Sequence, residues 1–220
     1  MTSARSWRER VALHRHDIDA AGRRWLIDAV RDQNALLAAA DHFDAFPYGL
    51  LLWESAPVLA DCLLELRPLT GRHVLEIGAG TGLGGLAARH LGAEVVQIDH
   101  AADALDLARA NAALNAIDGI EQIVADWEDW TPPHRFDVIV GADILYDQEV
   151  HAAIARLIVE CIAPGGVVLL TDPGRTARPA FVADMAGAGW TISETSRQVA
   201  AFHPTRPGET VAITIVTLRR

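Results

Sequence analysis

From residue 72 onward, short apolar runs alternate with longer amphipathic segments. The apolar runs are rich in Val, Ile and Leu, which is typical of strands, whereas the longer segments have helical spacing. The predicted strands are Val74–Ile77, Glu94–Ile98, Ile120–Ala125, Phe136–Val140 and Val167–Thr171. The predicted helices are Leu83–Leu91, Ala101–Asn115, Gln148–Ile162 and Pro179–Ala188. Strands that alternate with helices predict right-handed crossovers and a mainly parallel sheet.

The last two strand-like segments break this alternation. Trp190–Val199 and Thr210–Leu218 are separated by a turn-rich stretch without a helix. We therefore expect them to form an antiparallel hairpin at one side of the sheet. The predicted fold class is α/β: a Rossmann-like, seven-stranded, mostly parallel sheet with a C-terminal antiparallel hairpin and helices on both faces.

The first 46 residues differ from the rest of the chain because they are polar and rich in arginine. Their apolar positions read as helical and are Trp25, Leu26, Ala29, Val30, Leu36 and Leu37. We expect residues 1–46 to form an N-terminal helical arm packed on a main domain at 47–220. An arginine-bearing surface for an acidic partner is the alternative. A turn at Phe46–Gly49 leads into a strongly apolar helix at Leu50–Leu66.

Composition narrows the class of function. The chain has 220 residues, half of them hydrophobic, and a formal net charge of −10, which argues against a broad, non-specific grip on nucleic acid. All 19 basic residues are arginines, so the protein cannot be its own lysine substrate. Cys62 and Cys161 are expected to be buried free thiols, and no Cys/His spacing predicts a metal site. With neither a secretory signal nor a membrane-length apolar stretch, we expect a cytoplasmic protein, and the composition is compatible with a monomer.

A glycine-rich turn directly follows the first predicted strand of the sheet. Gly78, Gly80 and Gly82 alternate there, and the next helix begins at once. Glycine has no Cβ, so a ligand can approach the backbone of such a turn closely. Glu76 precedes the first glycine by two residues. A carboxylate there can accept hydrogen bonds from a cationic amino group, such as that of S-adenosylmethionine (SAM), and would repel a pyrophosphate.

Acidic residues stand at or just past the ends of five successive predicted strands. They are Glu76, Asp99, Asp126, Asp143 and Asp172. Ligands of open α/β sheets bind at the carboxyl ends of the strands, so we expect these acids to line one rim. Asp99 is placed to accept both ribose hydroxyls of SAM, and Asp126 with Trp127 to hold the adenine. His100 is expected to face either the adenine edge or solvent.

The glycines alone also allow a second interpretation. Gly80–Gly85 satisfies the dinucleotide pattern G-x-G-x-x-G, and Asp99 fits a nicotinamide ribose equally well. A nicotinamide-dependent oxidoreductase therefore remains an alternative. Glu76, the Asp126–Trp127 pair and the C-terminal hairpin favour SAM.

Three motifs make the chain resemble a known family over roughly residues 45–220. They are Tyr48-Gly49 with Trp53 ahead of the glycine loop, Leu75-Glu76-Ile77-Gly78-Ala79-Gly80-Thr81-Gly82, and Ala142-Asp143-Ile144-Leu145-Tyr146. With them the chain resembles the class I, seven-strand SAM-dependent methyltransferases. Within that class it is similar to the small protein-lysine methyltransferases, whose D-x-x-Y signature matches Asp143–Tyr146. Asp172–Arg175 resembles a segment of the branch that methylates the β subunit of electron-transfer flavoprotein.

The resemblance implies a SAM-dependent N-methyltransferase that acts on lysine side chains of a protein and releases S-adenosylhomocysteine. It implies that Trp53 and Ala142 line the SAM pocket and that Asp143 and Tyr146 face the methyl acceptor as catalytic residues. A carboxylate at the fourth strand's tip suits this role, because methyl transfer from a sulfonium requires chiefly that the amine be positioned and deprotonated.

Several points stay open at the level of sequence. Asp172 and Arg175 either border the acceptor site as substrate-binding residues or form a simple turn with a local ion pair. The acceptor is alternatively a small molecule of the nicotinamide or amine type. A non-catalytic SAM-binding module is a further alternative.

Overall fold

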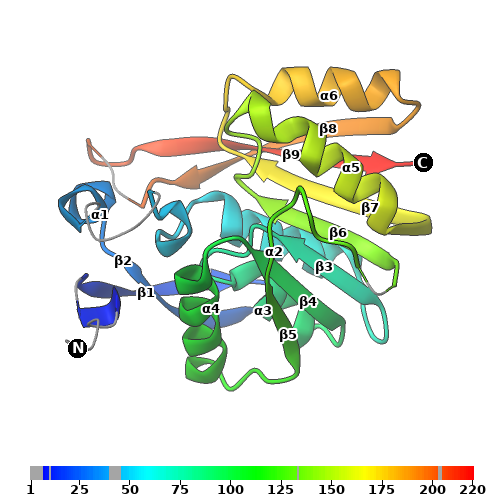
Figure 1. Cartoon of the computed structure of the whole chain (residues 1–220). Coiled ribbons are helices and arrows are strands. Elements are labelled where there is room, and N and C mark those ends of the chain that lie inside the picture. The colour runs from blue at the N-terminus through cyan, green and yellow to red at the C-terminus, as the bar shows by residue number, and fades with distance from the viewer. Residues whose placement is uncertain (1–6, 10, 40–45, 133, 203–204) are drawn as a thin grey trace, which may run out of the picture.

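A seven-stranded sheet forms the centre of the computed structural model, which describes residues 7–9, 11–39, 46–132, 134–202 and 205–220 (Figure 1). Its strands are β3 (His73–Ile77), β4 (Glu94–Asp99), β5 (Ile120–Val124), β6 (Phe136–Ala142), β7 (Ile162–Asp172), β8 (Thr191–Ala200) and β9 (Thr210–Arg219). Their order across the sheet is β5-β4-β3-β6-β7-β9-β8. The first five are parallel, and β9 is antiparallel to both β7 and β8. The predicted fold class, including the C-terminal hairpin, is confirmed.

Helices cover both faces of the sheet (Figure 1). Helices α2 (Ser55–Leu66) and α3 (Leu83–His90) pack on one face, and α5 (His151–Cys161) and α6 (Arg178–Gly187) on the other; α4 (Ala102–Leu114) contacts β4 and β5. Each face of the sheet has its own hydrophobic core. Successive strand residues point to opposite faces, so Val138 belongs to the core beneath α2 and α3, and Ile139 to the core beneath α5 and α6. None of the helices in the described part of the chain is long and apolar enough to cross a membrane.

Residues 13–30 form a β-hairpin, so the prediction of a helical arm is wrong for this part of residues 1–46. Strands β1 (Leu13–Ala20) and β2 (Arg23–Val30) pair antiparallel. Ala21 and Gly22 between them both have positive φ, 51° and 75°, as a two-residue type I′ turn requires. The only α-helix among the described residues before 46 is the short α1 (Gln33–Ala39), which follows the hairpin; a 3-10 turn at Trp7–Glu9 precedes it. Residues 1–6, 10 and 40–45 of the predicted arm lie outside the described residues.

The hairpin forms because its buried positions alternate with period two, which is the spacing of a half-buried strand. Trp25, Ile27 and Ala29 are fully buried against the main domain, whereas Arg24 is exposed. In a helix Trp25 and Ala29, four residues apart, would share a face, but Ile27 would point away from both. The hairpin is therefore packed on the main domain as expected of the arm, but with a different secondary structure.

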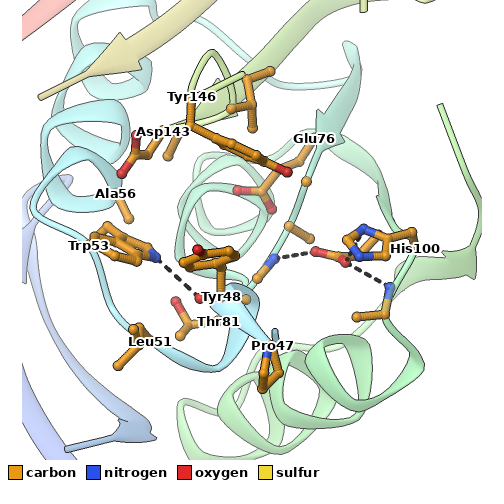
Figure 2. A pocket seen from close by; sticks show the side chains of 18 of the residues that line it. Pro47, Tyr48, Leu51, Trp53, Ala56, Glu76, Thr81, His100, Asp143 and Tyr146 are labelled. Carbon is orange, nitrogen blue, oxygen red and sulfur yellow. Dashed lines mark hydrogen bonds and ion pairs between the residues drawn. The ribbon is translucent and has the colours of Figure 1, made fainter. Parts of the chain in front are cut away.

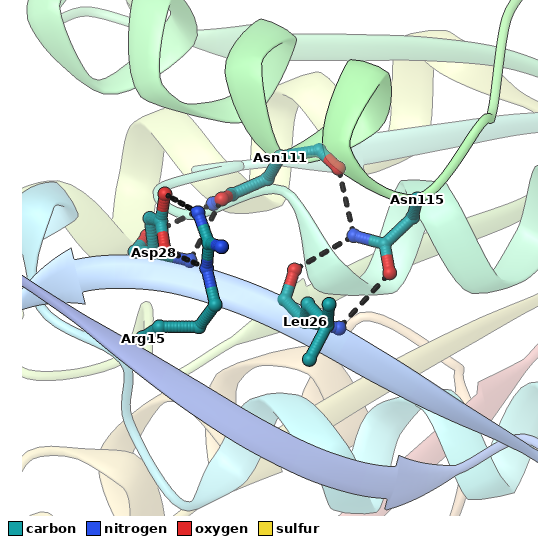
Figure 3. Close-up of polar contacts among 5 residues, drawn as sticks. All are labelled: Arg15, Leu26, Asp28, Asn111 and Asn115. Atoms are coloured by element: carbon teal, nitrogen blue, oxygen red, sulfur yellow. Dashed lines mark hydrogen bonds and ion pairs between the residues drawn. The ribbon is translucent and has the colours of Figure 1, made fainter.

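Asn111 of α4 and Asn115, the C-terminal cap of that helix, bind the edge of β2 that faces away from β1 (Figure 3). The Asn115 amide accepts from the Leu26 backbone N–H and donates to the Leu26 carbonyl, at 2.9 and 2.7 Å. Asn111 binds the backbone of Asp28 in the same way, at 2.9 and 3.0 Å. Because residues four apart share one face of a helix, the two amides act like a neighbouring strand. The carboxylate of Asp28 in turn accepts two hydrogen bonds from the guanidinium of Arg15 in β1.

Candidate active site

A pocket lies at the carboxyl ends of β3, β4 and β6, next to the glycine loop (Figure 2). It brings together most of the residues that the sequence predicts for the site. Those that line it are Trp53, Glu76, Gly78, Gly80, Asp99, His100, Trp127, Ala142, Asp143 and Tyr146. The carboxyl ends of β3, β4 and β6 therefore meet at one site, and three of the five acids expected along the rim, Glu76, Asp99 and Asp143, line it.

One wall of the pocket is bare backbone. Gly78 and Gly80 have φ of 66° and 52°, a region that L side chains rarely adopt. A Cβ on Gly78 would lie 2.8 Å from Cγ2 of Ile144, and one on Gly80 would lie 3.3 Å from the carbonyl oxygen of Gly49. Both positions favour glycine for conformation, and Gly78 also for space, whereas a Cβ at Gly80 would be tight. The wall that the two glycines form lets a ligand reach the main chain.

Glu76 lines the pocket but is also bound by the protein around it. Its Oε2 accepts from the Gly85 backbone N–H at 2.9 Å and from the Gln97 amide at 2.6 Å. The side chain is 2% exposed, and this burial raises its pKa to about 7. The two donors favour the charged form, as does the backbone of Gly84, but they do not offset the loss of hydration. A cationic ligand group beside Glu76 would stabilise the ionised carboxylate.

Asp99, at the end of β4, holds the glycine loop in place. Its two carboxylate oxygens accept from the backbone N–H of Gly80 and of Ala101, both at 2.9 Å. Each oxygen keeps lone pairs for further donors. Asp99 thus fixes the turn and can still accept from the hydroxyls of a ligand. The His100 ring lies beside it, with Nδ1 3.6 Å from the carboxylate.

Asp143 directly follows β6 on the opposite side of the pocket. Its backbone has φ of 55°, unusual for a residue with a side chain, and its N–H donates to the Thr171 carbonyl of β7 at 2.7 Å. Arg175 donates to both carboxylate oxygens, from Nε at 2.8 Å and from Nη2 at 2.7 Å. This ion pair joins two predicted site residues that are 32 positions apart.

Five aromatic side chains line the pocket: Phe46, Tyr48, Trp53, Trp127 and Tyr146. Figure 2 shows Trp53 and the two tyrosines around it. The two tyrosines are half exposed, and their ring centroids lie 6.1 Å apart. The Trp53 indole N–H donates to the Tyr48 carbonyl at 3.2 Å, which ties the segment before α2 together. Burial raises the pKa of the Tyr146 phenol, and the nearby carboxylates raise it further, so this hydroxyl stays protonated at neutral pH.

Four predicted residues lie outside the lining of this pocket. Gly82 is the left-handed N-cap of α3, and exposed Asp126 accepts from the Glu128 backbone N–H. Asp172 is buried, accepting from the backbone N–H groups of Gly174 and Arg175 and pairing with Arg178. Arg175 lines a smaller adjoining cavity that shares Trp53 and Asp143. The ligand roles of these four, like those of the lining residues, stay predictions.

Sequence reasoning missed two features of the site. Tyr48 and Gly49, which the sequence predicts only as part of a turn and of a family motif, supply part of the lining. The Arg175–Asp143 pair was not foreseen, since Asp172 is the nearer acid in the sequence. No local pattern could have found it, because the partners follow different strands.

A reversed strand inserted next to the edge of a parallel sheet, with a glycine-walled pocket at the strand ends, defines a class I methyltransferase fold. Solved structures agree. N-methyltransferase NodS of Bradyrhizobium japonicum, in complex with S-adenosylhomocysteine, superposes with a TM-score of 0.58 at 20% identity, covering 73% of this chain and 85% of that one.

A model of the lysine methyltransferase family matches residues 31–185, and the chain belongs to this family. Among curated relatives, protein N-lysine methyltransferase METTL21A of Danio rerio is 35% identical over 55% of this chain and 59% of its own. Cypemycin N-terminal methyltransferase of a Streptomyces species is 32% identical over 59% and 51%. The chain spans about half the length of such relatives.

Proposed function

We propose that this protein is a SAM-dependent N-methyltransferase that methylates lysine side chains of a protein substrate. The carrying observation is that one pocket joins a bare-backbone glycine wall to a buried carboxylate at the tip of β6. The first suits the methyl donor and the second suits an amine acceptor. Membership of the lysine methyltransferase family supports the choice of acceptor.

The residues on the β3 and β4 side are suited to hold SAM. Glu76 offers a carboxylate for the amino group, Asp99 offers acceptors for the ribose hydroxyls, and Trp127 and His100 border the end of the pocket suited to the adenine. When bound, SAM supplies a methyl group on a sulfonium. The methyl group is transferred to a nucleophile without further activation of the donor.

The remaining tasks fall to the acceptor side of the site. An amine attacks only in its neutral form, so the protein must bind the ammonium ion, orient it and let its proton leave. Asp143 is the carboxylate suited to orient the amine. The rings of Tyr48, Trp53 and Tyr146 form walls that an aliphatic lysine chain can pack against, and cations are attracted to such faces.

Incubation of a cell lysate with the protein and SAM labelled with tritium in the methyl group tests this proposal. We expect label in one or a few protein bands and in methyl-lysine after hydrolysis. Asp143→Asn should reduce transfer by about 100-fold or more, because it removes a positioned carboxylate. Asp184→Asn, which changes an exposed aspartate of α6, is the matched control and should retain full transfer.

The other outcomes are decisive as well. Label found only in small molecules would favour a nicotinamide- or amine-type acceptor. Thermal stabilisation by NAD and not by SAM or S-adenosylhomocysteine would contradict the methyltransferase proposal, because a ligand stabilises the native state that binds it.

A further inference from the structure

The carboxylate proposed to orient the acceptor already holds a cation of its own chain. Both oxygens of Asp143 accept from the Arg175 guanidinium, at 2.8 and 2.7 Å. The Asp143 side chain is 3% exposed and that of Arg175 is 36% exposed. A positively charged acceptor therefore meets an occupied partner rather than a free carboxylate.

This pairing has a physical reason. A buried carboxylate without a counter-charge is costly, and the backbone of Asp143, fixed by its bond to Thr171, directs the side chain into the site. Some cation must balance Asp143 whenever no acceptor is bound. Arg175 supplies that charge with a two-bond geometry that a carboxylate binds well.

The structure also offers the guanidinium another place. A cavity adjoining the main pocket is lined by Trp53, Glu54, Ser55 and Arg175 itself. The Arg175 guanidinium carbon is already 5.4 Å from the centroid of the Trp53 ring, a position favourable for a cation. The backbone N–H of Arg175 is anchored by Asp172 at 2.8 Å, so the side chain can rotate while its loop stays in place.

We propose that Arg175 is a resident substitute for the acceptor's cation. An acceptor ammonium group binds Asp143 by displacing the guanidinium, which moves across Trp53 into the adjoining cavity. One cation replaces another, so the buried carboxylate is never left unpaired. A neutral or anionic compound cannot make this exchange, so Arg175 selects cationic acceptors. A cation that binds Asp143 more weakly than the guanidinium does is excluded. This role rests on the proposed function, since it assumes an amine acceptor.

The direct test uses n-butylammonium, which has the length and charge of a lysine side chain. Its affinity for the full chain is measured by calorimetry at pH 8, with and without S-adenosylhomocysteine. Arg175→Gln should bind it about tenfold more tightly than the unmodified protein does, within the usual range for such coupling. Arg175→Lys, which keeps a cation, should stay closer to the unmodified protein.

Two controls separate this exchange from a general change of charge. Arg197→Gln removes an arginine of similar exposure, 34%, which pairs with exposed Glu65 outside both cavities, and should leave the affinity unchanged. n-Butanol, which lacks the charge, should gain nothing in Arg175→Gln. Equal or weaker binding of n-butylammonium by Arg175→Gln, or binding by neither protein, would overturn the role of Arg175.

The two proposals fail separately. If the unmodified protein binds S-adenosylhomocysteine and labels lysate proteins but Arg175→Gln gains no affinity for the ammonium ion, only the role of Arg175 is contradicted. If no methyl transfer to any amine occurs, the proposed function is contradicted, whatever the butylammonium result.

Discussion

The side-chain amide of Asn111 connects the N-terminal hairpin to the glycine loop. It donates to the carbonyl of Asp28 in β2 and to the carbonyl of Thr81, both at 3.0 Å. Asn111 is fully buried; its bond to Thr81 lies in the interior, and its bond to Asp28 is partly buried. A segment before the main sheet is thus tied to the loop that forms a wall of the pocket.

Asn111→Ala should therefore weaken both folding and SAM binding. Loss of its buried hydrogen bonds should lower the free energy of unfolding by about 2 kcal/mol or more. Release of Thr81 should raise the Kd of SAM about tenfold, the equivalent of one lost hydrogen bond of about 1.4 kcal/mol. Urea unfolding and calorimetric titration with SAM measure the two effects.

Asn115 provides the matched control because it holds the same strand from the same end of α4 without touching Thr81. Asn115→Ala should destabilise the fold comparably and leave SAM affinity nearly unchanged. Equal loss of SAM affinity in both variants would show that Asn111 acts only through the hairpin.

Glu76 predicts a pH dependence of stability. Its folded-state pKa of about 7 lies above the ordinary value of 4.5, so between these values the native state binds more protons than the unfolded state. The contribution of Glu76 to stability is thus full below about pH 4.5 and is lost as pH rises to about 7. In Glu76→Gln this component is absent. The stability difference between the two proteins, from urea unfolding at pH 5 and pH 8, should shift by on the order of 1 to 3 kcal/mol.

The direction of that shift decides the matter. The unmodified protein should lose stability relative to Glu76→Gln as the pH increases. A gain would mean that Glu76 is ionised and well paired in the folded protein at low pH, contrary to the effect of its burial.

Gly80→Ala should raise the Kd of SAM by about tenfold. It forces a side chain into φ of 52°, at about 1 to 2 kcal/mol, and places a methyl group 3.3 Å from the Gly49 carbonyl at the pocket wall. Gly187→Ala in α6 is the control, since no atom lies within 4 Å of the added Cβ and φ is not positive. It should bind SAM normally and unfold at the same or a slightly higher temperature. Normal SAM binding by Gly80→Ala would show that the ligand does not approach this wall.

The two cysteines should react with a thiol reagent only after unfolding. Both are buried and free, and burial raises the pKa of Cys62 to about 11 and that of Cys161 to about 12. Since the thiolate is the reactive form, native protein at pH 8 should be labelled by 5,5′-dithiobis(2-nitrobenzoate) far more slowly than protein in guanidinium chloride. Rapid labelling of the native protein would indicate that one thiol opens to solvent.

The central sheet could be predicted from sequence because its signals are local. Continuous apolar runs such as Val167–Leu170 and a glycine turn after β3 depend on neighbours in the chain. The N-terminal hairpin was misread because its apolar residues fit two periods over a short stretch. The alternation of Trp25, Ile27 and Ala29 and the Ala21-Gly22 turn were the signals that could have revealed it.

The sequence by itself determined the fold class and the edge of the sheet at which the acids gather, since strand ends and glycine turns follow from local spacing. Only the tertiary structure decided which acids share the pocket: Glu76, Asp99 and Asp143 line it, whereas Asp126 is exposed and Asp172 is buried and bound by the backbone of Gly174 and Arg175. It alone also decided that Arg175 pairs with Asp143 and that Asn111 links β2 to Thr81. The reason is physical: these bonds join residues distant in the chain, and their partners are set by packing and burial rather than by sequence spacing.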